Sequence, residues 1–258
     1  MTSMLFAPLL AASLFIGMLL LLELGRRFGQ RRLAADPEGA RASVDAIDGA
    51  VFALLSLLIA FTTSGAASRF DARRQLIVQE ANAIGTAYLR LDLLPPSAQP
   101  GLREKFRRYV ETRLEVYRKL PDVSAARAEL TKATKLQGEI WSQAVAATQV
   151  EGFQLARVVV LPALNEMIDI TTTRTVATQT HLPVVIFGML VVLALASSLL
   201  GGDRMAGSTS RSWIHMVGFA AVTALAVFVI LDLEYPRVGF IRLDAFDRLL
   251  VDLLANMK

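Results

Sequence analysis

Four stretches of apolar residues, almost free of charge, recur along the chain, and a long amphipathic region separates the second from the third. The apolar stretches cover residues 4–22, 49–68, 182–202 and 213–231. Each is close to the length of about 20 residues with which an α-helix crosses the hydrocarbon core of a bilayer. The pattern therefore predicts an all-α membrane protein with four transmembrane helices and a helical-bundle insert between the second and the third.

These stretches and the regions between them define the expected organisation of the chain. We expect, in order, a first transmembrane helix (1–24), a basic connector (25–45), a second transmembrane helix (46–68), a helical stalk and bundle insert (69–181), a third transmembrane helix (182–202), a loop (203–212), a fourth transmembrane helix (213–231) and an amphipathic C-terminal segment (232–258). The first stretch lacks the basic start of a secretory signal, and GRRFGQRR follows it instead of a cleavage site. It is therefore expected to remain as a transmembrane helix.

The second apolar stretch passes into the insert without a break, because residues 46–94 contain no proline and no turn cluster. Beyond residue 68 the composition becomes polar, but the helical period continues. One face carries polar residues, Gln75, Gln79, Asn82 and Thr86, and the opposite face carries Ile77, Ala81, Ile84, Tyr88 and Leu91. We predict one continuous helix over 46–94, roughly 70 Å long.

The rest of the insert is predicted to fold as an antiparallel bundle. Three prolines within residues 93–101 must end the first helix. The helix that follows places Leu102, Phe106, Tyr109, Val110, Leu114 and Tyr117 on one side. Two further helices joined by short loops complete four helices in all. After the last transmembrane stretch, Phe246, Leu249, Leu250 and Leu253 form the apolar face of a short helix, expected on the membrane surface or under the bundle.

Composition and charge narrow the function. The hydrophobic share is 54% and the chain has no cysteine, which excludes thiolate metal sites, thiol catalysis and disulfides. The net charge is only +4, and basic residues alternate with acidic ones, so no nucleic-acid partner is expected. The sequence has no phosphate-binding loop, dinucleotide fingerprint or nucleophile elbow. We therefore expect no enzymatic activity, no cofactor and no metal, with His181 and His215 as interfacial side chains.

A seam of small residues marks the second transmembrane helix. Its members recur at helical spacing: Gly49, Ala53, Ser56, Ala60, Thr63 and Ala67. Small residues allow another backbone to approach closely, so the seam is either a helix-packing surface or the lining of a pore. Packing is the simpler interpretation for any single residue.

Two polar groups lie near the predicted membrane boundaries. Thr171, Thr172 and Thr175 precede the third transmembrane helix, where they would either line an aqueous vestibule or hydrogen-bond to neighbouring helices. Arg69, Arg73 and Glu80 lie on one edge of the long helix at spacings of four and seven residues. They are candidates for an ion-pair cluster, although a solvated helix face explains them equally well.

Two segments of the chain are similar to a known family. SGAASRFDARRQLIVQEANAIGTAYLRLDLLP (residues 64–95) and LDLEYPRVGFIRLDAFDRLL (residues 231–250) resemble the bestrophin-like domain of bacterial multi-pass membrane proteins. The resemblance implies two spans, a helical insert and two more spans, and relatedness to homo-oligomeric anion channels. The calcium clasp of animal bestrophins has no counterpart, since Asp244, Asp247 and Asp252 are too widely spaced.

Two functions of different classes therefore remain. The first is a homo-oligomeric channel for small ions in the cell inner membrane, with the second span facing the pore. The second is a membrane-anchored sensor or interaction module whose bundle binds a partner without transport. The sequence also leaves two alternatives for the side of the membrane on which the insert lies. The arginines of residues 26–41 place the connector in the cytoplasm and the insert outside by the positive-inside rule, whereas the resemblance implies a cytoplasmic insert.

Overall fold

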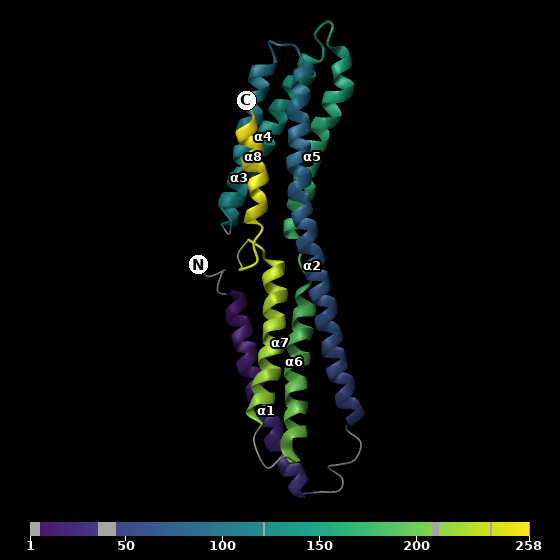
Figure 1. Ribbon diagram of the computed structural model, residues 1–258, viewed down its shortest axis with the longest axis vertical. Coiled ribbons are helices and arrows are strands. Elements are labelled where there is room, and N and C mark those ends of the chain that lie inside the picture. Colours follow the sequence, from purple (N-terminus) through teal and green to yellow (C-terminus); the bar gives the residue numbers. More distant parts are fainter. Residues whose placement is uncertain (1–5, 36–44, 121, 208–211, 238, 258) are drawn as a thin grey trace. The chain divides into compact units, whose positions relative to one another are not determined.

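The computed structural model describes residues 6–35, 45–120, 122–207, 212–237 and 239–257. Within these ranges every regular element is a helix (Figure 1). Four of the helices are long and apolar enough to cross a membrane, which confirms the predicted all-α membrane fold. The chain divides into two compact units: a transmembrane unit, Met1–Ser68 with His181–Tyr235, and an insert unit, Arg69–Thr180 with Pro236–Lys258.

The transmembrane unit is built on α1 (Phe6–Ala35), α6 (Val184–Arg204) and α7 (Trp213–Glu234), together with the first part of α2 (Asp45–Leu89). α1 lies alongside α6 and α7 (Figure 1). All four helices contribute apolar side chains to its core, which contains Leu14, Met18, Leu22, Leu55, Ala194, Met216, Ala220, Val227 and Leu231. The edge-to-face pair Phe52 and Phe219, with ring centroids 5.8 Å apart, adds α2 to this packing.

Glycines set the crossing of α1 and α6. A Cβ added at Gly25 would lie 2.0 Å from the carbonyl oxygen of Leu199, and one at Gly202 would lie 2.0 Å from that of Leu22. Only glycine fits at these two points, so the backbones themselves are in contact. α1 runs on to Ala35, into the segment expected as a connector, and α6 continues through Gly202 to Arg204. The remainder of that connector, residues 36–44, lies outside the described residues.

The continuous long helix is confirmed. α2 runs from Asp45 to Leu89 without interruption, and the 3₁₀ turn η2 (Arg90–Leu93) follows directly. The helical spacing of polar and apolar positions continues beyond residue 68, where the composition becomes polar. Ile77, Ile84, Tyr88 and Leu91, predicted on the apolar face, are all buried.

The insert unit contains the second part of α2 with α3 (Gln99–Arg118), α4 (Val123–Ala147), α5 (Arg157–Gln179) and α8 (Asp244–Asn256). The predicted apolar side of α3 is buried throughout. α3 packs along α4, and α8 packs on α3, with Leu250 in the same core (Figure 1). This short helix is thus part of the bundle, whereas the sequence led us to expect it on the membrane surface or under the bundle. Short 3₁₀ turns, η3 (Gln154–Ala156) and η4 (Met205–Gly207), complete the elements.

Candidate functional site

In the transmembrane unit, α2 exposes the seam of small residues. Gly49, Ala53, Ser56 and Ala60 are exposed, and a Cβ at Gly49 would meet nothing within 4 Å. The two remaining members of the seam, Thr63 and Ala67, are half-buried. The hydroxyl of Ser56 donates to the carbonyl oxygen of Phe52 at 2.9 Å. Because its hydrogen bond is satisfied within the helix, this side chain can face an apolar environment. This surface of α2 is therefore open to a neighbouring molecule.

Large apolar side chains border the seam on the same helix. Leu57 is 51% exposed and Phe61 is 68% exposed. In the insert unit, α2 exposes polar residues instead, with Gln75, Gln79 and Asn82 all accessible to solvent. One helix thus presents an apolar and small-residue surface over its first half and an uncharged polar stripe over its second half.

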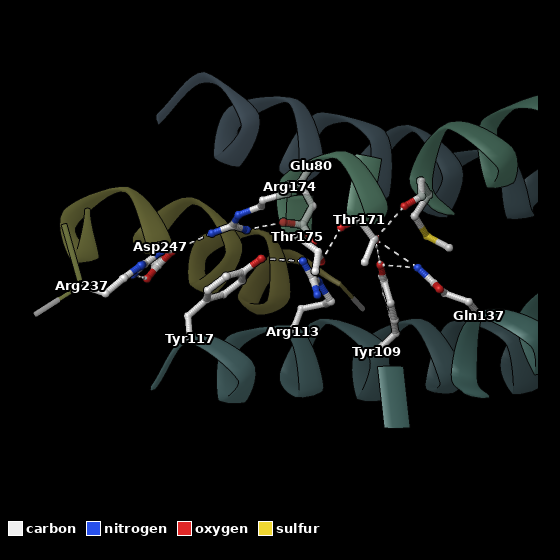
Figure 2. Close-up of polar contacts among 11 residues, drawn as sticks. Glu80, Tyr109, Arg113, Tyr117, Gln137, Thr171, Arg174, Thr175, Arg237 and Asp247 are labelled. Atoms are coloured by element: carbon white, nitrogen blue, oxygen red, sulfur yellow. Dashed lines mark hydrogen bonds and ion pairs between the residues drawn. The ribbon is translucent and has the colours of Figure 1, made fainter. Parts of the chain in front are cut away.

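A buried ionic cluster joins three helices of the insert unit (Figure 2). The carboxylate of Glu80 on α2 accepts from Nε of Arg113 on α3 at 2.5 Å and also pairs with Arg174 on α5. The side chains of Glu80 and Arg113 are 0% exposed, and that of Arg174 is 3% exposed. The local reason is periodicity: each residue lies on the otherwise apolar inward face of an amphipathic helical segment, so the charges meet where the three faces converge.

Tyr117 lies at the centre of the positive charges. The guanidinium carbons of Arg174, Arg237 and Arg113 lie 3.8, 4.9 and 5.2 Å from its ring centroid. Its hydroxyl accepts from Nη2 of Arg113 at 2.6 Å. The negative face of the ring therefore stabilises cations that the buried carboxylate alone does not neutralise.

A second acidic residue extends the cluster to α8. Asp247 accepts from Nη2 of Arg174 at 3.3 Å and from Nη2 of Arg237 at 3.0 Å (Figure 2). Arg237 also donates to Asp244 at 3.1 Å. Positive and negative side chains alternate along the series Arg113, Glu80, Arg174, Asp247 and Arg237. These ion pairs connect α8 to the other helices of the bundle.

The cluster shifts the pKa values of its members. Burial alone would raise the pKa of Glu80, but the charges of Arg113 and Arg174 and their hydrogen bonds outweigh it and hold this pKa below its usual range. Burial would lower the pKa of Arg113, yet the neighbouring Tyr117 and Glu80 raise it. Burial raises the pKa of Tyr117. The two ionic partners are therefore charged and Tyr117 is neutral around neutral pH.

A neutral hydrogen-bond network lies beside the ionic one. The hydroxyl oxygens of Thr171 and Tyr109 are 2.8 Å apart, and the amide of Gln137 donates to Tyr109 at 3.1 Å and to Thr171 at 3.0 Å (Figure 2). Burial raises the pKa of Tyr109 to about 12. These side chains connect α3, α4 and α5 without a net charge.

The candidate residues near the membrane boundaries are placed as follows. Thr171 belongs to the buried network, Thr175 is half-buried and donates to the carbonyl of Thr171 at 2.8 Å, and Thr172 is exposed. Arg73 is buried and donates to the carbonyl oxygens of Ala177 and Thr180 at 3.1 and 2.7 Å. Arg69 is half-buried on the same helix. Glu80 is held by arginines of two other helices rather than by Arg69 or Arg73 of its own.

Sequence reasoning missed Arg113 and Arg174. A signal for Arg113 was present, because it falls at helical spacing between Tyr109 and Tyr117 on the apolar face of α3, where a charged side chain requires a buried partner. Arg174 gave a weaker signal as a single cation within a run of threonines. No group of three or more histidine or acidic side chains among the described residues could hold a metal ion.

Comparison with known proteins identifies the family. The family model of the Bestrophin-like domain matches residues 12–245 of the chain. No curated protein matches the sequence. Among solved structures, a single-residue variant of a bacterial bestrophin homologue from Klebsiella pneumoniae superimposes with a TM-score of 0.70 at 16% identity, covering 94% of this chain and 99% of that one. A second variant gives 0.65 at 16% identity, with 94% and 98% covered. The two structures support the fold, and the match over residues 12–245 shows that the chain belongs to the bestrophin-like family.

Proposed function

We propose that the protein is a homo-oligomeric ion channel, selective for anions, in the cell inner membrane. The observation that carries this proposal is the exposure of Gly49, Ala53, Ser56 and Ala60 along one face of a transmembrane helix. Membership of the bestrophin-like family and the fold shared with bacterial bestrophin homologues support it. No catalytic role is proposed.

Physical reasons favour placing this face toward other subunits. Lipid chains solvate large apolar side chains as well as small ones, so exposure to lipid gives no reason for a helix to present glycine, alanine and serine at regular spacing. In a ring of subunits, small residues let copies of α2 approach one axis and leave a narrow path between them. Helix packing and pore lining, the two interpretations of the seam, then become the same arrangement.

The bordering side chains agree with such a ring. Leu57 and Phe61 would contact the neighbouring subunit or constrict the path, and hydrophobic constrictions are one way in which channels gate. Gln75, Gln79 and Asn82 would give the continuation of α2 an uncharged polar surface toward water. The exposed Thr172 is a candidate for a vestibule position.

Flux through liposomes tests the proposal. Purified protein is reconstituted, and chloride and potassium movement down a gradient are measured separately, with the oligomeric state determined in detergent. We expect chloride flux from the parent protein. Ala60→Trp should strongly reduce it, because the indole would fill the space near the axis. Ala221→Trp is the matched control, since Ala221 is also an exposed alanine of a transmembrane helix, α7.

Several outcomes would contradict the channel. A strict monomer could not form a pore along one helix face. Oligomers that pass neither ion would favour the membrane-anchored sensor or interaction module instead. Equal flux from the two tryptophan variants would remove α2 from the pore even if the protein conducts.

A further inference from the structure

A charged pocket in the insert unit has no role in the proposed conduction. It has a volume of about 360 Å³ and lies between the end of α3, the segment that leads into α8, and α8 itself. This volume falls in the range of about 300–1,000 Å³ that is usual for small-molecule sites. Arginine guanidinium groups and apolar side chains share its lining.

The lining carries an excess of positive charge. Arg118, Arg237, Arg242 and Arg248 face two carboxylates, Asp244 and Asp247. Arg118 pairs with Glu115 outside the pocket at 2.9 Å, but the cluster behind the wall supplies two arginines, Arg113 and Arg174, for one Glu80. An excess of two positive charges therefore remains when these neighbours are counted. Arg248 is exposed and forms no ion pair with a residue that the structure describes.

The two aspartates do not make this a cation site. Asp247 is already bound by Arg174 and Arg237, and Asp244 lies 3.1 Å from Arg237 and 3.4 Å from Arg242. A metal ion would have to displace guanidinium groups from both carboxylates. A planar guanidinium is instead suited to bind carboxylate or phosphate through two parallel hydrogen bonds.

Apolar side chains form the remaining wall. Leu114, Leu120 and Val251 line the pocket beside the ring of Tyr117. Inorganic anions would gain nothing from these contacts, whereas an organic group would bury apolar surface against them. The arginine-rich wall and the apolar wall lie within one cavity, so together they favour a molecule that carries both an anionic group and an apolar group.

We infer that this pocket binds a small organic anion, with a carboxylate or phosphate group held by Arg242 and Arg248 and an apolar portion against Leu114, Leu120 and Val251. Arg237 lines the pocket but is already held by Asp247, so we assign it no direct bond to the ligand (Figure 2). Because the site spans α3 and α8, a bound ligand also stabilises the docking of the C-terminal helix. This inference does not depend on conduction.

Calorimetric titration of the full-length, detergent-solubilised protein tests the site with phenyl phosphate as the probe. The double variant Arg242→Gln/Arg248→Gln should weaken binding about tenfold or more. Both arginines are exposed, so the fold is expected to survive. Arg107→Gln/Arg127→Gln removes the same charge from two exposed arginines outside the pocket and should bind like the parent.

A second variant separates the two walls. Val251→Ser should weaken phenyl phosphate several-fold but leave the weaker binding of inorganic phosphate unchanged, since only the first ligand contacts the apolar wall. The proposal is overturned if phenyl phosphate does not bind, or if the two double variants lose binding equally. Equal affinity for phenyl phosphate and inorganic phosphate would contradict the organic character of the ligand. A loss of binding in both double variants with intact flux would reject the site and leave the channel proposal untouched.

Discussion

The two units of the molecule differ in how far their ion pairs are buried and in what brings their helices together. In the transmembrane unit, α1 and α6 meet through glycines, and ion pairs such as Arg32 with Asp203 and Arg204 with Asp48 keep the arginine partly exposed, at 48% and 41%. In the insert unit, Glu80 and Arg113 are completely buried at the point where α2 and α3 meet. Close backbone contact thus holds one unit together, and a specific set of charged partners organises the other.

The glycine contact and the buried ion pair contribute to the fold in different ways. The contact of Gly25 and Gly202 with the opposing backbone works only at one register of two helices, because a shift would bring a side chain into the other backbone. A buried ion pair costs desolvation, and apolar residues of the same volume often give equal stability. We therefore interpret the cluster around Glu80 as a device that selects the helix partners in a bundle whose core is otherwise apolar, apart from the network of Tyr109, Gln137 and Thr171. Replacing Glu80, Arg113 and Arg174 together by apolar residues would test this: retained stability with loss of a single packing arrangement is the expected result.

Removing one member of the buried cluster should have the largest effect. Glu80→Gln leaves Arg113 buried without a carboxylate and leaves Arg174 only its 3.3 Å contact with Asp247. We expect the free energy of unfolding of the insert unit to fall by about 3–5 kcal/mol. Thermal unfolding and limited proteolysis of the purified protein measure the loss. Glu111→Gln is the matched control, because Glu111 is exposed on α3. Equal stability of the two variants would mean that the cluster is not what holds these helices.

Disturbing the glycine crossing should have a smaller effect, confined to the transmembrane unit. Gly202→Ala introduces a Cβ that would lie 2.0 Å from the carbonyl oxygen of Leu22, so α1 and α6 must move apart. We expect a cost of about 1–3 kcal/mol in thermal unfolding. Gly188→Ala on the same helix meets nothing within 4 Å and should be neutral or slightly stabilising. A similar loss in both variants would reject close contact as the reason for glycine.

The sequence predicted the elements of both units better than their partners. Periodicity within one segment was enough for α2 and for the buried face of α3. The partners of Glu80 come from α3 and α5, far along the chain, and spacing on a single helix pointed to Arg69 and Arg73 instead. Gly25 and Gly202 gave no signal of a crossing for the same reason, since each requires knowledge of the opposing backbone.

Acid should affect the insert unit through Glu80. The pKa of this carboxyl is lowered in the folded state from a usual value of 4.5, so the unfolded state binds a proton first as the pH falls. The contribution of Glu80 to stability is therefore complete above about pH 4.5 and declines below it. We expect the unfolding midpoint of the parent to fall more steeply between about pH 5 and pH 3.5 than that of Glu80→Gln. Parallel curves would show that Glu80 does not hold its charge in the folded state.

The last measurement perturbs neither unit and assigns the insert unit to one side of the membrane. The chain has no cysteine, so Ser43→Cys and Ser124→Cys each introduce a single thiol, the second at an exposed position of α4. Residues 26–41 carry five arginines near the first span, and the positive-inside rule predicts that this segment faces the cytoplasm. We therefore expect an impermeant thiol reagent on intact cells to label position 124 and not position 43. Labelling of position 43 alone would invert this orientation and place the buried cluster and the anion pocket in the cytoplasm, where intracellular metabolites would be the source of the ligand.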